Sequence, residues 1–151
     1  MTSILETLSH PVQAVCKNLA NYGTTNGPVV VWNRTHQKAA DLAAESERFA
    51  AVADLTDAVS STDIVCLCLI DDAAVAEVLE TVTRETDVKG KLFVDFSTVH
   101  PDTAAAQADT LKSHGAEYLA SPSKRCRDDC ADARADTLKF SGVSRWPLRG
   151  S

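Results

Sequence analysis

Glycine is scarce in this sequence, with six in 151 residues and none before Gly23. Phosphate-binding loops rely on glycine, because a Cβ atom keeps the backbone away from a pyrophosphate. The stretch "TLSHPVQAVCKNLANYG", residues 7–23, reads as a helix that follows the short apolar strand "SIL". A glycine-rich loop of the usual kind is therefore excluded at the position where dinucleotide-binding folds place it.

Basic residues and long apolar runs are lacking as well. Fifteen Lys and Arg stand against 21 Asp and Glu, for a net charge of −6, and such a balance argues against nucleic acid or a membrane surface as a partner. No apolar run approaches the length of about 18 residues that spans a bilayer. The opening "MTSILETLSH" has no basic flank of the kind seen in secretory signals. We therefore expect a cytoplasmic protein with no nucleic-acid or membrane partner.

The cysteine pattern predicts free thiols rather than disulfides or a metal site. The five cysteines are odd in number and lack framework spacing, which suits a reducing compartment. Cys66 and Cys68 alternate within "DIVCLCLI" and would share one face of a strand. Cys126 and Cys130 have no second Cys or His pair beside them, and a metal site needs three or four ligands. We therefore predict no metal.

Apolar strand patterns alternate with helical patterns along most of the chain. Strands are expected over 27–33, 49–53, 63–70, 91–97 and 116–122, and helices over 35–47, 54–63, 71–83 and 100–115. Such alternation with short loops predicts an α/β fold with a doubly wound, mostly parallel sheet. We expect one domain over residues 1–122, followed by an irregular, poorly ordered tail over 123–151.

Ligands of such sheets lie beyond the carboxyl ends of the strands, so the residues after "VVVW" are informative. An acid there would accept a hydrogen bond from a ribose 2′-hydroxyl, whereas an arginine pairs with a 2′-phosphate. The strand ends instead in Asn33, Arg34 and Thr35, with no acid. The alternative interpretation is a surface arginine followed by a threonine that caps the next helix.

A second group of polar residues follows the strand in "FVDFSTVHP". Asp95, Ser97 and Thr98 are small polar residues at the end of an apolar strand, and we expect them to face the mouth of the site. The alternative is an ordinary connection in which Ser97 or Thr98 caps a helix that begins at Pro101.

Together these segments resemble a known family. The series "CKNLANYG", "VVVWNRTHQKAADL", "TDIVCLCLIDDAAVAEVL", "KLFVDFSTVHPDTA" and "GAEYLASP" is similar to the cofactor domain of the β-hydroxyacid dehydrogenases. That group includes 3-hydroxyisobutyrate and 6-phosphogluconate dehydrogenases, glyoxylate and succinic semialdehyde reductases, and imine reductases. The resemblance covers residues 14–122 and implies a Rossmann-like fold.

The resemblance also implies roles for individual residues. Asn33, Arg34 and Thr35 would hold the adenosine ribose and its 2′-phosphate, which favours NADP over NAD. Leu69 and Ile70 would line the cofactor, although Ile70 replaces the more usual proline or serine.

On the substrate side, Ser97 and Thr98 match a "D-x-S-T" element that meets the substrate carboxylate and the nicotinamide. The substrate would be a small hydroxyacid, aldehyde or imine, and the family implies a possible homo-oligomer.

The amino-terminal part departs from the family pattern. The glycine positions of the loop fall on Thr7, Ser9 and Val12, and Pro11 removes one N–H group from the helix start. Cofactor binding should therefore be weak. Glu6 ends a first strand that should be buried on both faces, so we expect that strand to be short, shifted or poorly formed.

The carboxyl-terminal part departs too. In the family a helical domain with a catalytic lysine follows, but neither Lys124 nor Lys139 matches that lysine, so no catalytic residue is assigned. We interpret the chain as a truncated cofactor domain that is inactive alone. The alternatives are a non-catalytic nucleotide-binding or interaction module on the same scaffold, and a flavodoxin-like receiver whose acidic pocket would include Asp71 and Asp72.

Overall fold

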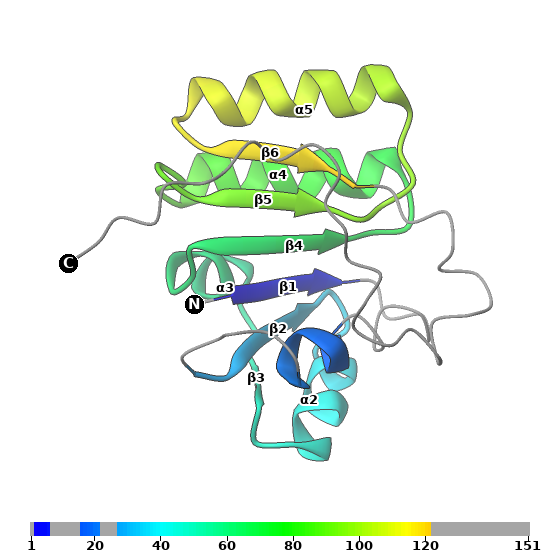
Figure 1. The fold of residues 1–151 in the computed structure, drawn as a ribbon, viewed down its shortest axis with the longest axis vertical. Helices are drawn as coiled ribbons and strands as arrows, with labels where there is room; N and C mark the ends of the chain where they lie inside the picture. The colour runs from blue at the N-terminus through cyan, green and yellow to red at the C-terminus, as the bar shows by residue number, and fades with distance from the viewer. Residues whose placement is uncertain (1, 7–15, 22–26, 122–151) are drawn as a thin grey trace.

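The computed structural model describes residues 2–6, 16–21 and 27–121, which build one six-stranded sheet of order β3-β2-β1-β4-β5-β6 (Figure 1). All neighbouring strands in it are parallel. The strands are β1 (Thr2–Glu6), β2 (Val29–Asn33), β3 (Phe49–Ala51), β4 (Ile64–Cys68), β5 (Leu92–Asp95) and β6 (Glu117–Ala120). The chain adds strands outward from β1 in one direction and then, from β4, in the other. The predicted doubly wound α/β fold is confirmed.

β1 differs from the sequence-based expectation. It is a five-residue strand that pairs in parallel with β2 on one side and with β4 on the other. Because both of its edges lie against a neighbour, backbone hydrogen bonds from two strands support it. Glu6 is its last residue, in register with Asn33 and Cys68 at the carboxyl end. The expectation of a short, shifted or poorly formed strand is therefore wrong for the backbone.

The helices lie between the strands, as the sequence predicts. They are α2 (His36–Glu45), α3 (Leu55–Ser60), α4 (Asp72–Glu85) and α5 (Pro101–Ser113), and residues 16–21 are also helical. In the described part of the chain no helix is both long and apolar enough to cross a bilayer.

The end of α5 depends on Gly115. The N–H of Gly115 donates to the carbonyl of Lys112, and the N–H of Ala116 donates to that of Leu111, both at 3.0 Å. This paired arrangement is the Schellman motif, which requires a left-handed residue just beyond the helix. Gly115 has φ of +76° and supplies it.

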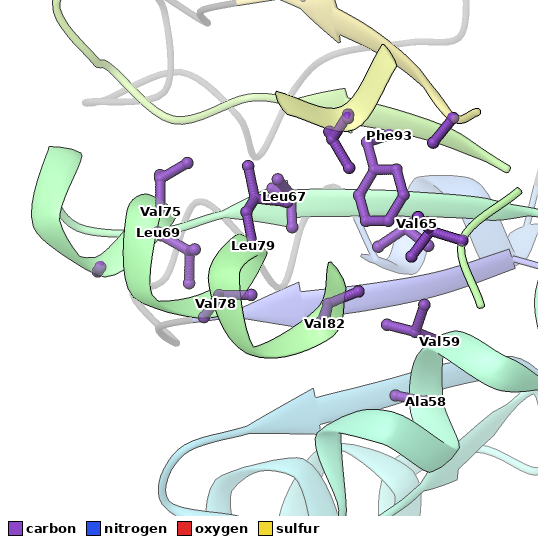
Figure 2. Close-up of a cluster of buried hydrophobic side chains, with 14 of the residues drawn as sticks. Ala58, Val59, Val65, Leu67, Leu69, Val75, Val78, Leu79, Val82 and Phe93 are labelled. Atoms are coloured by element: carbon purple, nitrogen blue, oxygen red, sulfur yellow. The ribbon is translucent and has the colours of Figure 1, made fainter. Parts of the chain in front are cut away.

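Two apolar layers enclose the sheet. One lies under α3, α4 and α5, and Figure 2 shows Val75, Leu79 and Val82 of α4 beside Leu67 of β4 and Phe93 of β5. The other includes residues from the 16–21 helix, α2 and the opposite face of the strands: Cys16, Ala20, Val31, Leu42, Cys66 and Val94. Because β4 is buried on both faces, its uninterrupted apolar run needs no alternation.

The described cysteines follow the same pattern. Cys16, Cys66 and Cys68 are buried and form no disulfide, and Cys66 belongs to the layer opposite Leu67. Burial raises the pKa of the Cys66 thiol to about 12. Cys126 and Cys130 lie outside the described residues, as do the loop positions Thr7, Ser9, Pro11 and Val12 and the predicted tail over 123–151.

Candidate functional site

The predicted site residues meet at one edge of the sheet. In a parallel sheet the carboxyl ends of all strands share an edge, and in Figure 1 the strand arrowheads point to it. The three groups lie at the ends of β2, β4 and β5 there: Asn33 to Thr35, Leu69 and Ile70, and Ser97 and Thr98. Between β2 and β4 lies β1, where the order of the strands reverses.

A buried asparagine shapes the turn after β2. Asn33 is 4% exposed, and its Oδ1 accepts a 2.8 Å hydrogen bond from the N–H of Thr35. An asparagine that bonds the backbone two residues ahead forms an Asx turn. This turn leads directly into α2 and leaves Arg34 and Thr35 at the surface.

The start of α2 carries no negative charge. Thr35 occupies the N-cap position without a side-chain capping bond, and no acid lies in the first turn. Arg34, His36 and Lys38 are exposed around it. The N–H groups of a helix start and the helix dipole both favour an anion. The start of α2 by itself therefore favours an anion.

The starts of α4 and α5 at this edge are acidic. At α4, Asp71 accepts a 2.8 Å hydrogen bond from the N–H of Ala74. Asp72 accepts another of 2.8 Å from the N–H of His100, the N-cap residue of α5. A hydrogen bond from the Thr103 side chain and that backbone N–H lower the pKa of Asp72. These acids cap and connect α4 and α5, so they do not form the acidic pocket of a receiver.

Arg34 contacts a residue from the far side of β1. Its Nη2 lies 3.0 Å from Oε2 of Glu77 on α4. Both side chains are largely exposed, at 63% and 68%. An ion pair so open to solvent contributes about 0–1 kcal/mol, so a ligand can displace it at little cost.

The residues after β4 divide between core and surface. Leu69 is buried, whereas Ile70 is 76% exposed. Such an exposed aliphatic side chain at the sheet edge offers an apolar surface to a ligand.

Asp95 does not face the mouth of the site as the sequence predicts. It is 1% exposed, its Oδ1 accepts from the N–H of Ser97 at 2.8 Å, and its Oδ2 accepts from the Tyr118 hydroxyl at 2.7 Å. The prediction is wrong because β6 brings Tyr118 to the end of β5, where it covers the carboxylate. Tyr118 was missed from the sequence, since nothing local to "AEYLASP" indicates a partner 23 residues away.

Ser97 is buried as well, while Thr98 is exposed. The Oγ of Ser97 accepts a 2.9 Å hydrogen bond from the N–H of Leu69. The same hydroxyl retains a proton to donate. Ser97 thus connects the ends of β4 and β5, and neither it nor Thr98 caps α5, because His100 does.

A shallow pocket of about 180 Å³ lies elsewhere. It is lined by Lys17, Ala20, Asn21, Glu45, Ser46 and Phe49. Glu45 ends α2 and Phe49 begins β3, so the pocket lies toward the amino ends of the strands. A 2.6 Å ion pair between Lys17 and Glu45 crosses it. Among the residues that the structure describes, no group of three His, Cys, Asp or Glu side chains could hold a metal ion.

The strand order agrees with a family comparison. The model of the NAD binding domain of 6-phosphogluconate dehydrogenase matches residues 13–129. The chain belongs to this family. It is an NAD(P)-binding domain of the 6-phosphogluconate dehydrogenase type, as the resemblance in its sequence implies.

Individual relatives of this NAD(P)-binding domain have different names. An NADH-dependent oxidoreductase, ucdB, of Aspergillus ustus is 38% identical over 109 residues, which are 72% of this chain and 38% of that protein. The human protein called cytokine-like nuclear factor N-PAC is 31% identical over 110 residues, 72% of this chain and 19% of its own.

A solved structure gives the same picture of the fold. The imine reductase from Myxococcus stipitatus in complex with NADP+ superposes with a TM-score of 0.68 at 27% identity. The match covers 80% of this chain and 39% of the imine reductase. The NAD(P)-binding domain thus spans less than two-fifths of the length of each of these three proteins.

Proposed function

We propose that this domain binds NADP(H) in preference to NAD(H) at the carboxyl edge of the sheet. The observation that carries the proposal is the acid-free start of α2, with Arg34 exposed beside it. Guanidinium groups match phosphate oxygens with a rigid fork of donors. The Asx turn of Asn33 presents Arg34 and Thr35 at the position where the adenosine ribose and its 2′-phosphate would lie.

The other predicted contacts follow the same edge. Leu69 and the exposed Ile70 would line the cofactor, and Thr98 would lie on the nicotinamide side. Ser97 donates to the substrate carboxylate in this proposal while it accepts from the N–H of Leu69. In the whole protein the bound cofactor would exchange a hydride with a small hydroxyacid, aldehyde or imine.

Titration of the 151-residue polypeptide with NADPH and with NADH tests the cofactor assignment. We expect NADPH to bind more tightly than NADH, and we expect about tenfold weaker NADPH binding by Arg34→Ala because one charge-assisted contact to phosphate is lost. Arg84→Ala is the matched control, because Arg84 is an equally exposed arginine in the last turn of α4. Equal NADPH affinity in the native chain and Arg34→Ala would contradict the assignment.

We propose further that the 151-residue polypeptide, tested alone, does not catalyse the oxidation of NADPH by an aldehyde or an imine. None of the lysines in the sequence matches the catalytic lysine that the family resemblance implies. NADPH oxidation should therefore stay at background with glyoxylate, succinic semialdehyde or a cyclic imine. Clear turnover with any of the three substrates would overturn this proposal.

A non-catalytic interaction module is the second candidate. The observation that favours it is the similarity to N-PAC, whose name describes a nuclear factor and not an enzyme. The nucleotide titration separates the candidates, because an interaction module without cofactor affinity would bind neither NADPH nor NADH. A cytoplasmic location and a homo-oligomer stay predictions, and light scattering after size exclusion would test the second.

A further inference from the structure

Glu77 lies where it would meet the 2′-phosphate that the proposed function assigns to Arg34. Its Oε2 is 3.0 Å from Nη2 of Arg34, although the two residues are 43 positions apart. Arg34 follows β2, and Glu77 belongs to the helix that follows β4. The ion pair therefore connects the elements on either side of β1, where a doubly wound sheet holds its ligand.

From this geometry we infer that Glu77 determines cofactor specificity by competing with a 2′-phosphate for the Arg34 guanidinium. The inference rests on the proposed function and goes beyond it, because it predicts that a second residue, Glu77, lowers the affinity for NADP(H). A 2′-phosphate that takes Arg34 leaves the Glu77 carboxylate beside another negative group, which is unfavourable. A 2′-hydroxyl carries no charge and can donate a hydrogen bond to the same carboxylate.

The surroundings of Glu77 support this assignment. The next acid on α4, Glu80, lies 3.8 Å from Arg84, which also pairs with Glu85 at 2.9 Å. Glu80 and Glu85 thus share Arg84, whereas Glu77 pairs with Arg34. Both Arg34 and Glu77 are solvent exposed, so the pair can open without unfolding any part of the domain.

Nucleotide affinities of charge-neutral variants test the inference. We expect Glu77→Gln to tighten NADPH binding about fivefold, the size of effect produced by removing one like charge near the surface. NADH binding should not tighten, because the 2′-hydroxyl carries no charge to repel and would lose a charged acceptor. Glu80→Gln is the matched control, since it removes the same charge from the same helix without touching Arg34. The gain in NADPH affinity should shrink at high salt, because exposed charges are screened.

The outcomes separate this inference from the proposed function. If the native chain binds NADPH through Arg34 and Glu77→Gln behaves like Glu80→Gln, only the role of Glu77 is overturned. If the native chain and Glu77→Gln bind neither nucleotide, the proposed function and this inference both fail. The affinities for 2′,5′-ADP and for 5′-ADP give a second readout. Glu77→Gln should tighten the binding of 2′,5′-ADP but not that of 5′-ADP.

Discussion

The hydroxyl of Tyr118 donates a 2.7 Å hydrogen bond to Oδ2 of Asp95, a carboxylate that is 1% exposed. This bond joins β6 to β5 at the sheet edge that carries the candidate site. The backbone repeats the connection, because the N–H of Ser121 donates to the carbonyl of Asp95 at 2.8 Å. Asp95 and Tyr118 therefore stabilise the end of β5, which Ser97 and Thr98 follow.

Loss of the Tyr118 hydroxyl should destabilise the domain. In Tyr118→Phe the buried Oδ2 of Asp95 loses the hydroxyl that donates to it, at a cost of about 1–3 kcal/mol in the free energy of unfolding. Urea unfolding followed by circular dichroism measures it. Thr110→Ala removes a hydroxyl that bonds only within the exposed face of α5 and should change stability by less than about 0.5 kcal/mol. Equal stabilities of the two variants would contradict this role.

Alkaline pH should also destabilise the domain. Burial, the hydrogen bond to Asp95 and the charge of that carboxylate raise the pKa of Tyr118 well above its ordinary value. Above about pH 10 the unfolded chain then releases a proton that the folded chain keeps, so the stability falls as pH rises. Burial of the Cys66 thiol acts with the same sign between its ordinary pKa and about 12.

Comparison of Tyr118→Phe with the native protein separates these contributions. In Tyr118→Phe the fall in stability above about pH 10 should become shallower, while the part due to Cys66 remains. The tyrosinate absorbance of the folded native protein should rise only at higher pH than that of the urea-unfolded chain. A free energy of unfolding that stays constant through this pH range would show that neither group is linked to folding.

Ser97→Ala should lower the free energy of unfolding, because Ser97, which is proposed to contact the substrate, also stabilises the fold. The buried N–H of Leu69 would lose its acceptor, which costs about 1–3 kcal/mol in the free energy of unfolding. Thermal and urea unfolding measure the change. Ser113→Ala, which removes an exposed hydroxyl bonded to a carbonyl in the same helix, is the control. If the two serine variants were equally stable, the hydrogen bond between Ser97 and Leu69 would not contribute to the stability of the domain.

Gly115→Ala should destabilise the end of α5 by about 1–2 kcal/mol, since an L residue is strained in the left-handed region. The added Cβ would also lie 3.2 Å from Cγ of Lys89. Gly90→Ala is the matched comparison, because Gly90 has φ of +75° and nothing within 4 Å of a Cβ. Both variants should lose stability in urea, and Gly115→Ala should lose at least as much. Unchanged stability of Gly115→Ala would rule out a strained cap.

Local sequence signals account for most of the fold. The apolar run of β4 indicates a strand buried on both faces, and Pro101 marks the start of α5. Each signal acts over a few residues, through backbone geometry or side-chain burial. The first strand was misjudged because its stability comes from pairing with β2 and β4, which are distant in sequence.

The candidate site likewise depends partly on local sequence and partly on contacts between residues that are distant in sequence. The sequence by itself determined the succession of strands and helices along the chain, and it placed Asn33 at the end of β2 with Arg34 and Thr35 directly after it, because an Asx turn and a helix start are local structures. Only the tertiary structure decided that Arg34 meets Glu77 and that Asp95 is covered by Tyr118. Those partners are 43 and 23 residues apart, and their contact depends on the strand order and on helix packing, which no local pattern specifies.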